Sequence, residues 1–282
     1  MRTRQILNML LREAGIGLAL LVLVIVFWIL APRFGSHANF TNILTQISIN
    51  TVIAVGMTFV ILLGGIDLSV GSVLALATVV GGLVITREGL SPGLAILLSV
   101  LCCLAVGMIC GLFNGFVSER WKIHSFIVTL GMLNIARGAA LQISNSRTIF
   151  SFPDAFNDVG SATVAGVPVI FLIAAAAVFA GRFILNRTVF GRLIYAIGNN
   201  EEAVRLSGHN PSFYKVTAFV LTGGMVGLAA IMYMMRLNIA SPILGVGVEL
   251  NAIAAVVIGG TSMSGGKGSL VGTFLGACIM GS

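Results

Sequence analysis

Asp67 is the residue of this sequence whose chemistry is easiest to isolate, because it is the one charged residue between Arg33 and Arg87. On insertion scales, an Asp at the centre of a membrane-spanning helix costs about 2.5–3.5 kcal/mol, so a carboxylate in such a position indicates a functional or structural role. It could contact a polar solute, pair with a cation, or cap a helix that starts near Ser69. Asp and Ser are strong cap residues, and the capping role is therefore favoured.

A phosphate-binding loop is the second chemistry to test, at the Gly-rich segment around Lys267. The Walker pattern requires G-x-x-x-x-G-K-[ST] between a strand and a helix. Thr261 stands where its first glycine belongs, and Gly268 follows the lysine in place of Ser or Thr. The pattern fails, so we expect no nucleotide site and no cofactor in this chain.

Cysteine and histidine chemistry is not indicated either. The four cysteines lie in apolar runs without a CxxC pair, and the three histidines stand singly. We therefore predict no catalytic or metal-binding residue, and the chain is not expected to be an enzyme.

The longest polar stretch, residues 186–212, offers a binding surface instead. Within it, residues 200–208 have a helical composition, with Glu202 and Arg205 spaced to pair on one face and Gly208 placed to end the helix. Ala203 and Leu206 would give this short helix an apolar face with no core of its own. Such a face predicts a partner, although an ordinary solvated connector is the alternative.

The elements that must position these residues follow from composition. The chain is 57% hydrophobic and 9% charged, and 30 uncharged residues separate Glu88 from Glu119. About 20 mainly apolar residues suffice for a helix to cross the hydrocarbon layer. A membrane protein is therefore predicted, which excludes a soluble enzyme, a secreted disulfide scaffold and a nucleic-acid-binding domain.

Helices are favoured over a barrel, because runs such as 18–29 are apolar on every face and lack a two-residue alternation. Gly107, Gly111 and Gly115 repeat every fourth residue, which predicts close packing between helices. The expected fold is an all-α polytopic transmembrane bundle. Its spans are predicted at 14–32, 43–64, 70–86, 93–117, 123–143, 166–185, 213–235 and 250–262, with a last segment starting near 269.

Charge distribution orients these spans. With the N-terminus inside, the inner side receives eleven Lys and Arg and the outer side four, in keeping with the positive-inside rule. The first apolar run is read as a retained span and not as a signal peptide. The third and fifth spans are the candidates for broken or re-entrant helices, and residues 144–165 are expected to form a short surface helix or cap outside.

Two segments of the sequence resemble each other, and this topology places both on the inner side of the membrane. Residues 60–75 (VILLGGIDLSVGSVLA) and 256–271 (VVIGGTSMSGGKGSLV) both interrupt an apolar run with Gly-Gly and a Ser-containing break. Glycine-interrupted segments in corresponding places indicate discontinuous helices that line a transport path. The predicted path residues are Gly64, Gly65, Asp67, Ser69, Gly259 and Gly260.

Three segments carry a resemblance to a known family: GGIDLSVGS at 64–72, FGRLIYAIGNNEEAVRLSG at 190–208, and ELNAIAAVVIGGTSMSGGKGSLVGTFLGA at 249–277. With them the chain resembles the permease subunit of bacterial ABC importers for monosaccharides of the ribose, xylose, arabinose and galactose type. The resemblance implies a multi-pass protein of the inner membrane with a cytoplasmic N-terminus, which moves a monosaccharide, such as the pentose ribose, by alternating access.

The resemblance also implies partners. They are a second permease chain, expected to form a homodimer, a periplasmic sugar-binding protein, and a cytoplasmic ATPase with tandem nucleotide-binding domains that binds ATP and Mg. Residues 186–212 would be the cytoplasmic coupling segment, whose short helix docks on the ATPase. The residues carried over to that role are Gly191, Arg192, Glu201, Glu202, Ala203, Arg205, Leu206, Ser207 and Gly208.

One departure and two alternatives accompany this interpretation. Family members usually run further at the C-terminus, so residues 1–282 are expected to form a single permease domain that lacks the final span or spans. The same fold could import nucleosides, inositol, autoinducer-2 or branched-chain amino acids. An ion-coupled secondary transporter would need intramembrane carboxylates, for which Asp67 alone is a thin candidate.

Overall fold

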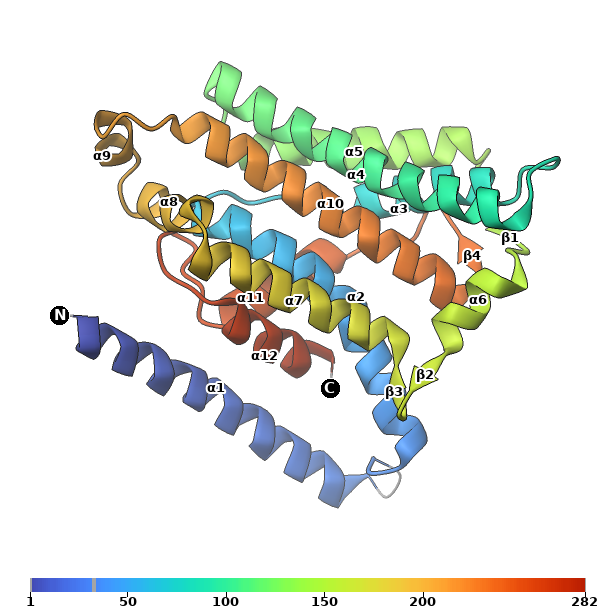
Figure 1. The fold of residues 1–282 in the computed structure, drawn as a ribbon, viewed down its shortest axis with the longest axis horizontal. Coiled ribbons are helices and arrows are strands. Elements are labelled where there is room, and N and C mark those ends of the chain that lie inside the picture. The colour runs from blue at the N-terminus through green and yellow to red at the C-terminus, as the bar shows by residue number, and fades with distance from the viewer. Residues whose placement is uncertain (1, 32–33, 282) are drawn as a thin grey trace.

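The computed structural model describes residues 2–31 and 34–281 and confirms the all-α fold (Figure 1). Arg33 and the side chains of residues 2–13, which entered the charge analysis, lie outside what is described. The elements are α1 (Arg2–Leu30), α2 (His37–Leu62), α3 (Val70–Ile85), α4 (Pro92–Trp121), α5 (Ser125–Ile143), β1 (Ile149–Phe150), α6 (Asp154–Ser161), β2 (Thr163–Val164), β3 (Val167–Pro168), α7 (Val169–Arg187), α8 (Val189–Asn199), α9 (Glu201–Leu206), α10 (Pro211–Leu237), β4 (Ile239–Ala240), α11 (Val248–Ile258) and α12 (Leu270–Gly281).

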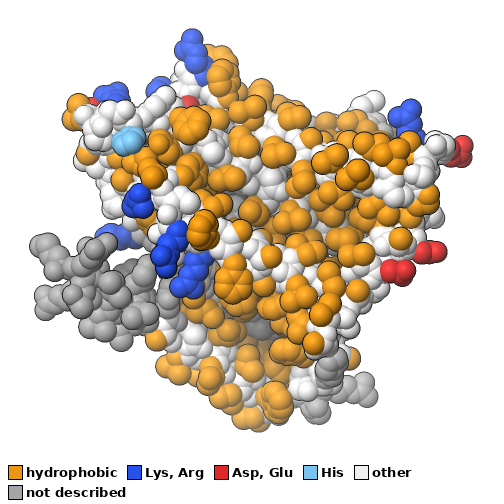
Figure 2. Space-filling model, in the orientation of Figure 1, with side chains coloured by type: hydrophobic (Ala, Val, Ile, Leu, Met, Phe, Trp, Pro, Cys, Tyr) orange, Lys and Arg blue, Asp and Glu red, His pale blue; other side chains and the backbone are white. Residues whose placement is uncertain are grey.

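Among the described residues, five helices are long and apolar enough to cross a membrane: α2, α4, α5, α7 and α10. Of these, α2 and α10 are mostly buried, whereas α4, α5 and α7 leave most of their apolar surface open. Figure 2 shows hydrophobic side chains over the middle of one face, with charged side chains toward its two ends. This distribution suits a bundle whose outer helices face lipid.

Glycine packing joins the two helices at the centre of the bundle. A Cβ on Gly107 would overlap the carbonyl oxygen of Gly223, and one on Gly111 would overlap that of Phe219. Gly115 faces the Val216 backbone in the same way. The four-residue spacing therefore lets α4 lie directly against α10, as expected from the sequence.

Two helix breaks lie between elements and not inside them. The chain leaves α2 at Leu62 and enters α3 at Val70, and it is broken again between α11 and α12. Gly64 and Gly260 take φ values of +77° and +83° in these breaks, which favour glycine. α3 and α5 are each continuous, so neither contains an internal break. α3, at 16 residues, is shorter than the five long helices, and a re-entrant course for the third or fifth span stays a prediction.

A cap covers the end of the bundle opposite these breaks. There β1 pairs with β4, and α6 follows within the segment where a short helix was expected. Phe152 and Phe156 are buried and meet edge to face at 6.1 Å. The backbone N–H of Phe152 donates to Asn238 Oδ1 at 3.1 Å, which fixes the cap to the end of α10.

Candidate functional site

The candidate site is the end of the bundle at which α8, α9 and both helix breaks meet. The predicted short helix is present as α9, and Asn200 caps it by accepting a hydrogen bond from Ala203 N at 3.0 Å. Ser207 follows the helix, and Gly208 leaves it with φ +88°. The local sequence thus specifies this helix at both of its ends.

The side chains of α9 divide into an anchor and an open face. Val204 is 6% exposed and holds the helix against the bundle, a contact that the sequence analysis missed. Ala203 is exposed, and Leu206 is 79% exposed, so the expected apolar face is open. A nonpolar side chain as exposed as Leu206 on a charged helix is suited to contact a partner.

Glu202 and Arg205 form the predicted pair on this open face. Their carboxylate oxygen and guanidinium nitrogen lie 2.7 Å apart, and both side chains are exposed. The hydrogen bond that Arg205 donates to the Glu202 carboxylate raises the pKa of Arg205 above its ordinary value. The pair presents one anion and one cation outward, and it contributes little to folding because solvent screens it.

α8 connects the α9 region to the break between α11 and α12. Tyr195 donates its hydroxyl hydrogen to Gly268 O at 3.0 Å, and Asn199 Nδ2 donates to Gly266 O at 3.1 Å. Gly266 N in turn donates to Leu62 O at 2.9 Å. The two breaks, whose sequences resemble each other, therefore touch each other and are tied to the same helix.

The start of α8 holds the two remaining coupling candidates. Thr188 caps this helix by accepting from Gly191 N at 3.2 Å. Gly191 is buried so closely against the Ile184 and Leu185 carbonyls that a Cβ would overlap them. Arg192 is exposed. Gly191 therefore shapes the turn from α7, whereas Arg192 is free to face outward.

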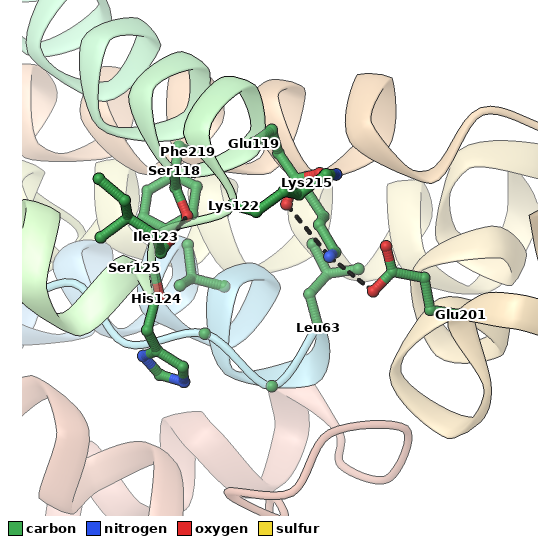
Figure 3. A pocket seen from close by; sticks show the side chains of 13 residues that line it. Leu63, Ser118, Glu119, Lys122, Ile123, His124, Ser125, Glu201, Lys215 and Phe219 are labelled. Carbon is green, nitrogen blue, oxygen red and sulfur yellow. Dashed lines mark hydrogen bonds and ion pairs between the residues drawn. The ribbon is translucent and has the colours of Figure 1, made fainter.

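A cavity of about 370 Å³ opens beside α9 (Figure 3). Lys215 of α10 lines it, with Nζ 2.7 Å from Glu201 Oε2 and 3.1 Å from Glu119 Oε1. Gly64 and Gly65 line the same cavity. The sequence gave no signal for this ion network, since its three charged residues lie in three separate elements.

The other predicted path residues lie away from the cavity walls. Asp67 is buried, and its Oδ1 accepts from Ser69 N at 2.8 Å and Ser69 Oγ at 2.6 Å. Asn114 Nδ2 also donates to Ser69 Oγ at 2.9 Å. Asp67 thus orders the turn that precedes α3. The N-cap residue of α3 is Ser69, which makes no side-chain cap hydrogen bond, so Asp67 holds the cap residue and does not itself cap the helix.

The glycine pair of the second break is divided between two environments. A Cβ on Gly259 would meet the backbone of Gly272 in α12, whereas Gly260 turns the chain with its positive φ. Lys267 lies in the loop between helices α11 and α12, whereas the Walker pattern requires a loop between a strand and a helix. The break is a packed turn between two helices.

Arg137 has a structural partner that sequence reasoning did not identify. Its Nη1 donates to Pro242 O at 2.5 Å and to Leu244 O at 2.7 Å. Both carbonyls belong to the segment between β4 and α11, at the capped end of the bundle. The guanidinium therefore supplies hydrogen bonds to two carbonyl groups of a segment that lies outside the helices and strands.

Comparisons with known proteins agree with this architecture. Residues 39–282 match the family described as branched-chain amino acid transport system / permease component. The chain is 42% identical to the ribose import permease protein RbsC of Haemophilus influenzae, over 94% of this chain and 81% of that protein. It is 40% identical to RbsC of Bacillus subtilis, over 96% of this chain and 84% of that protein. It is 36% identical to the L-arabinose ABC transporter permease protein AraH of Azospirillum brasilense, over 97% of this chain and 79% of that protein. No solved structure matches the chain.

Proposed function

The chain belongs to the family of branched-chain amino acid transport system / permease components, and on this basis we propose that it is the permease subunit of an ABC importer for a monosaccharide, a pentose such as ribose. The names of its relatives, ribose and L-arabinose permeases, support the substrate class. The open face of α9 supports the importer mechanism, because it offers a separate subunit a place to act.

In this proposal the α8–α9 end faces the cytoplasm. A cytoplasmic ATPase with tandem nucleotide-binding domains holds ATP and Mg and receives α9. Arg192, Ala203, Leu206 and the exposed pair of Glu202 and Arg205 then contact the ATPase. Glu201 belongs to the coupling segment through its ion pair with Lys215, and Ser207 and Gly208 end the helix. A periplasmic binding protein delivers the sugar at the opposite end of the bundle, and a second permease chain completes the pathway.

Alternating access follows from the connections around α9. Movement of the coupling segment, residues 186–212, reaches both helix breaks, because α8 is bonded to the break at Gly266 and Gly268, and that break to Leu62. Displacing α8 would therefore shift the ends of α2 and α11 together. Gly64, Gly65 and the second glycine pair would open or close the inner end of the path.

The decisive experiment is uptake into proteoliposomes that contain the permease, its ATPase and its binding protein. We expect radiolabelled ribose to enter only when ATP is supplied, and uptake to survive a protonophore. Uptake that ignores ATP but stops with the protonophore would favour an ion-coupled transporter instead. Competition by unlabelled arabinose, nucleosides, inositol and branched-chain amino acids identifies the substrate class.

Docking through α9 is tested separately. We expect less ATPase to co-purify with Leu206→Glu, and also with a variant in which Glu202 and Arg205 are replaced by residues of opposite charge. The permease itself should remain folded, because these side chains are exposed. Val159→Glu changes an exposed nonpolar residue of α6, at the opposite end, and is the matched control. Normal ATPase association in the α9 variants would contradict this docking role.

A further inference from the structure

Lys215 of α10 makes an ion bridge to α9 and to α4. Its Nζ lies 2.7 Å from Glu201 Oε2 on α9 and 3.1 Å from Glu119 Oε1 near the end of α4. The lysine side chain is 20% exposed and that of Glu119 is 11% exposed. Ser212 Oγ also donates to Glu119 Oε2 at 2.6 Å, which holds the carboxylate on the α10 side.

The surroundings make this bridge different from the surface pairs nearby. Lys122 also reaches Glu119, at 3.2 Å, but its side chain is 70% exposed. The pair of Glu202 and Arg205 is exposed on both sides. Screened pairs contribute little, whereas removing one partner of a poorly solvated pair leaves a charge uncompensated.

The bridge also lies where movement would matter. Glu119, Lys215 and Glu201 lie together in the wall of the cavity (Figure 3), which Gly64 and Gly65 of the first helix break also line. α9 is joined along the chain to α8 and to α10, and Val204 packs against the bundle. Lys215 adds a charged contact between α9 and α10 and, through Glu119, a link to α4. α4 and α10 pack closely on each other through Gly107 and Gly223.

We propose that Lys215 is a positioning residue, which transmits displacement of α9 to the inner ends of α4 and α10 through Glu201 and Glu119. This inference rests on the proposed function, since it assigns a route to the force that the ATPase applies. Docking on the open face of α9 and transmission through its inner face are then separate properties. A variant can lose the second and keep the first.

The test compares Lys215→Met, Lys215→Arg and Lys122→Met in the reconstituted importer. Methionine keeps the length and apolar stem of lysine without its charge, and arginine keeps the charge and can reach both carboxylates. Lys122→Met is the matched control, because it removes the other lysine on Glu119. The measured quantities are ATPase co-purification and the amount of ribose imported per ATP hydrolysed.

We expect Lys215→Met to keep the ATPase bound but to lower ribose imported per ATP by at least about fivefold, the low end of typical coupling between sites. Lys215→Arg and Lys122→Met should match the wild type. An unchanged ratio in Lys215→Met would overturn the inference. So would a loss of assembled complex with a normal ratio, since a merely structural role predicts that result.

A second variant and a second measurement keep the outcome decisive. Glu201→Gln removes the charge at the α9 side, where the side chain is 45% exposed and folding is less at risk. Amide hydrogen exchange in α9 of the isolated permease should accelerate in Glu201→Gln and Lys215→Met but not in Lys122→Met. Equal rates of amide exchange in α9 of all three variants would show that the ion bridge does not hold α9 in place, and would overturn the inference. A wild-type complex that imports no ribose would contradict the proposed function alone, because exchange still reports on the bridge.

Discussion

Asp67 shows how a single residue can look functional and serve the local backbone. Its carboxylate accepts both hydrogen bonds of Ser69, so replacing it with Asn keeps the acceptor oxygen. We predict that Asp67→Asn retains ATP-driven uptake and that Asp67→Ala lowers the free energy of unfolding by about 1–3 kcal/mol, because buried donors are left unpaired. Thermal unfolding in detergent measures the second effect. Loss of uptake in a stable Asp67→Asn variant would instead place Asp67 in the path.

Arg137 leads to a second prediction at the residue scale. Arg137→Met removes two hydrogen bonds to Pro242 and Leu244 carbonyls and should lower stability by about 1–3 kcal/mol. Hydrogen exchange should rise in residues 241–247 more than elsewhere. Arg236→Met, an exposed arginine at the same end, is the control and should leave this segment protected. Equal protection in both variants would show that the carbonyl contacts are dispensable.

At the scale of elements, the contact between α4 and α10 depends on glycine. Gly107→Ala would place a methyl group against Gly223 O and push the helices apart, so we expect a loss of about 1–3 kcal/mol. Gly131→Ala on α5 meets nothing within 4 Å and should be tolerated. Thermal midpoints of the two purified variants make the comparison. Equal midpoints would mean that this interface adjusts freely.

The link between α8 and the second helix break is also a property of elements. Tyr195→Phe removes the hydrogen bond to Gly268 O and should cost about 1 kcal/mol, with faster hydrogen exchange in residues 262–269. Tyr214→Phe removes the same hydroxyl from a ring that packs on Phe190 and is the matched control. If exchange is as fast in the control variant, the hydroxyl of Tyr195 does not hold the break.

Orientation in the membrane is a property of the whole molecule. α9 and α6 lie at opposite ends of the bundle (Figure 1), and the proposed function places α9 in the cytoplasm. In a variant with the four cysteines replaced by Ala, Leu206→Cys should react with an impermeant thiol reagent only after the cytoplasmic face is exposed. Asp158→Cys on α6 should react from outside. The opposite labelling pattern would refute the cytoplasmic placement of residues 186–212 and with it the docking proposal.

The sequence alone determined the class of molecule and most of its elements. Hydropathy, span length and caps are local properties, so the apolar runs predicted α2, α4, α7 and α10 to within a few residues, and Asn200 with Gly208 predicted α9. The Gly-Gly repeats likewise located both helix breaks. The third and fifth spans contain no internal break, because glycines within a packed or lipid-facing helix need not interrupt it. The predicted spans at 70–86 and 250–262 correspond to helices of 16 and 11 residues, which are shorter than the five long helices.

Tertiary structure decided which distant groups meet. Lys215 reaches Glu119 across 96 positions of sequence and Arg137 reaches Pro242 across 105, and no local pattern encodes either pairing. Val204 is buried whereas the neighbouring nonpolar residues Ala203 and Leu206 are exposed, because the packing of α9 decides which of its side chains face the bundle. Local spacing fixes where a helix begins and ends, whereas the direction of each side chain depends on how all the helices pack together.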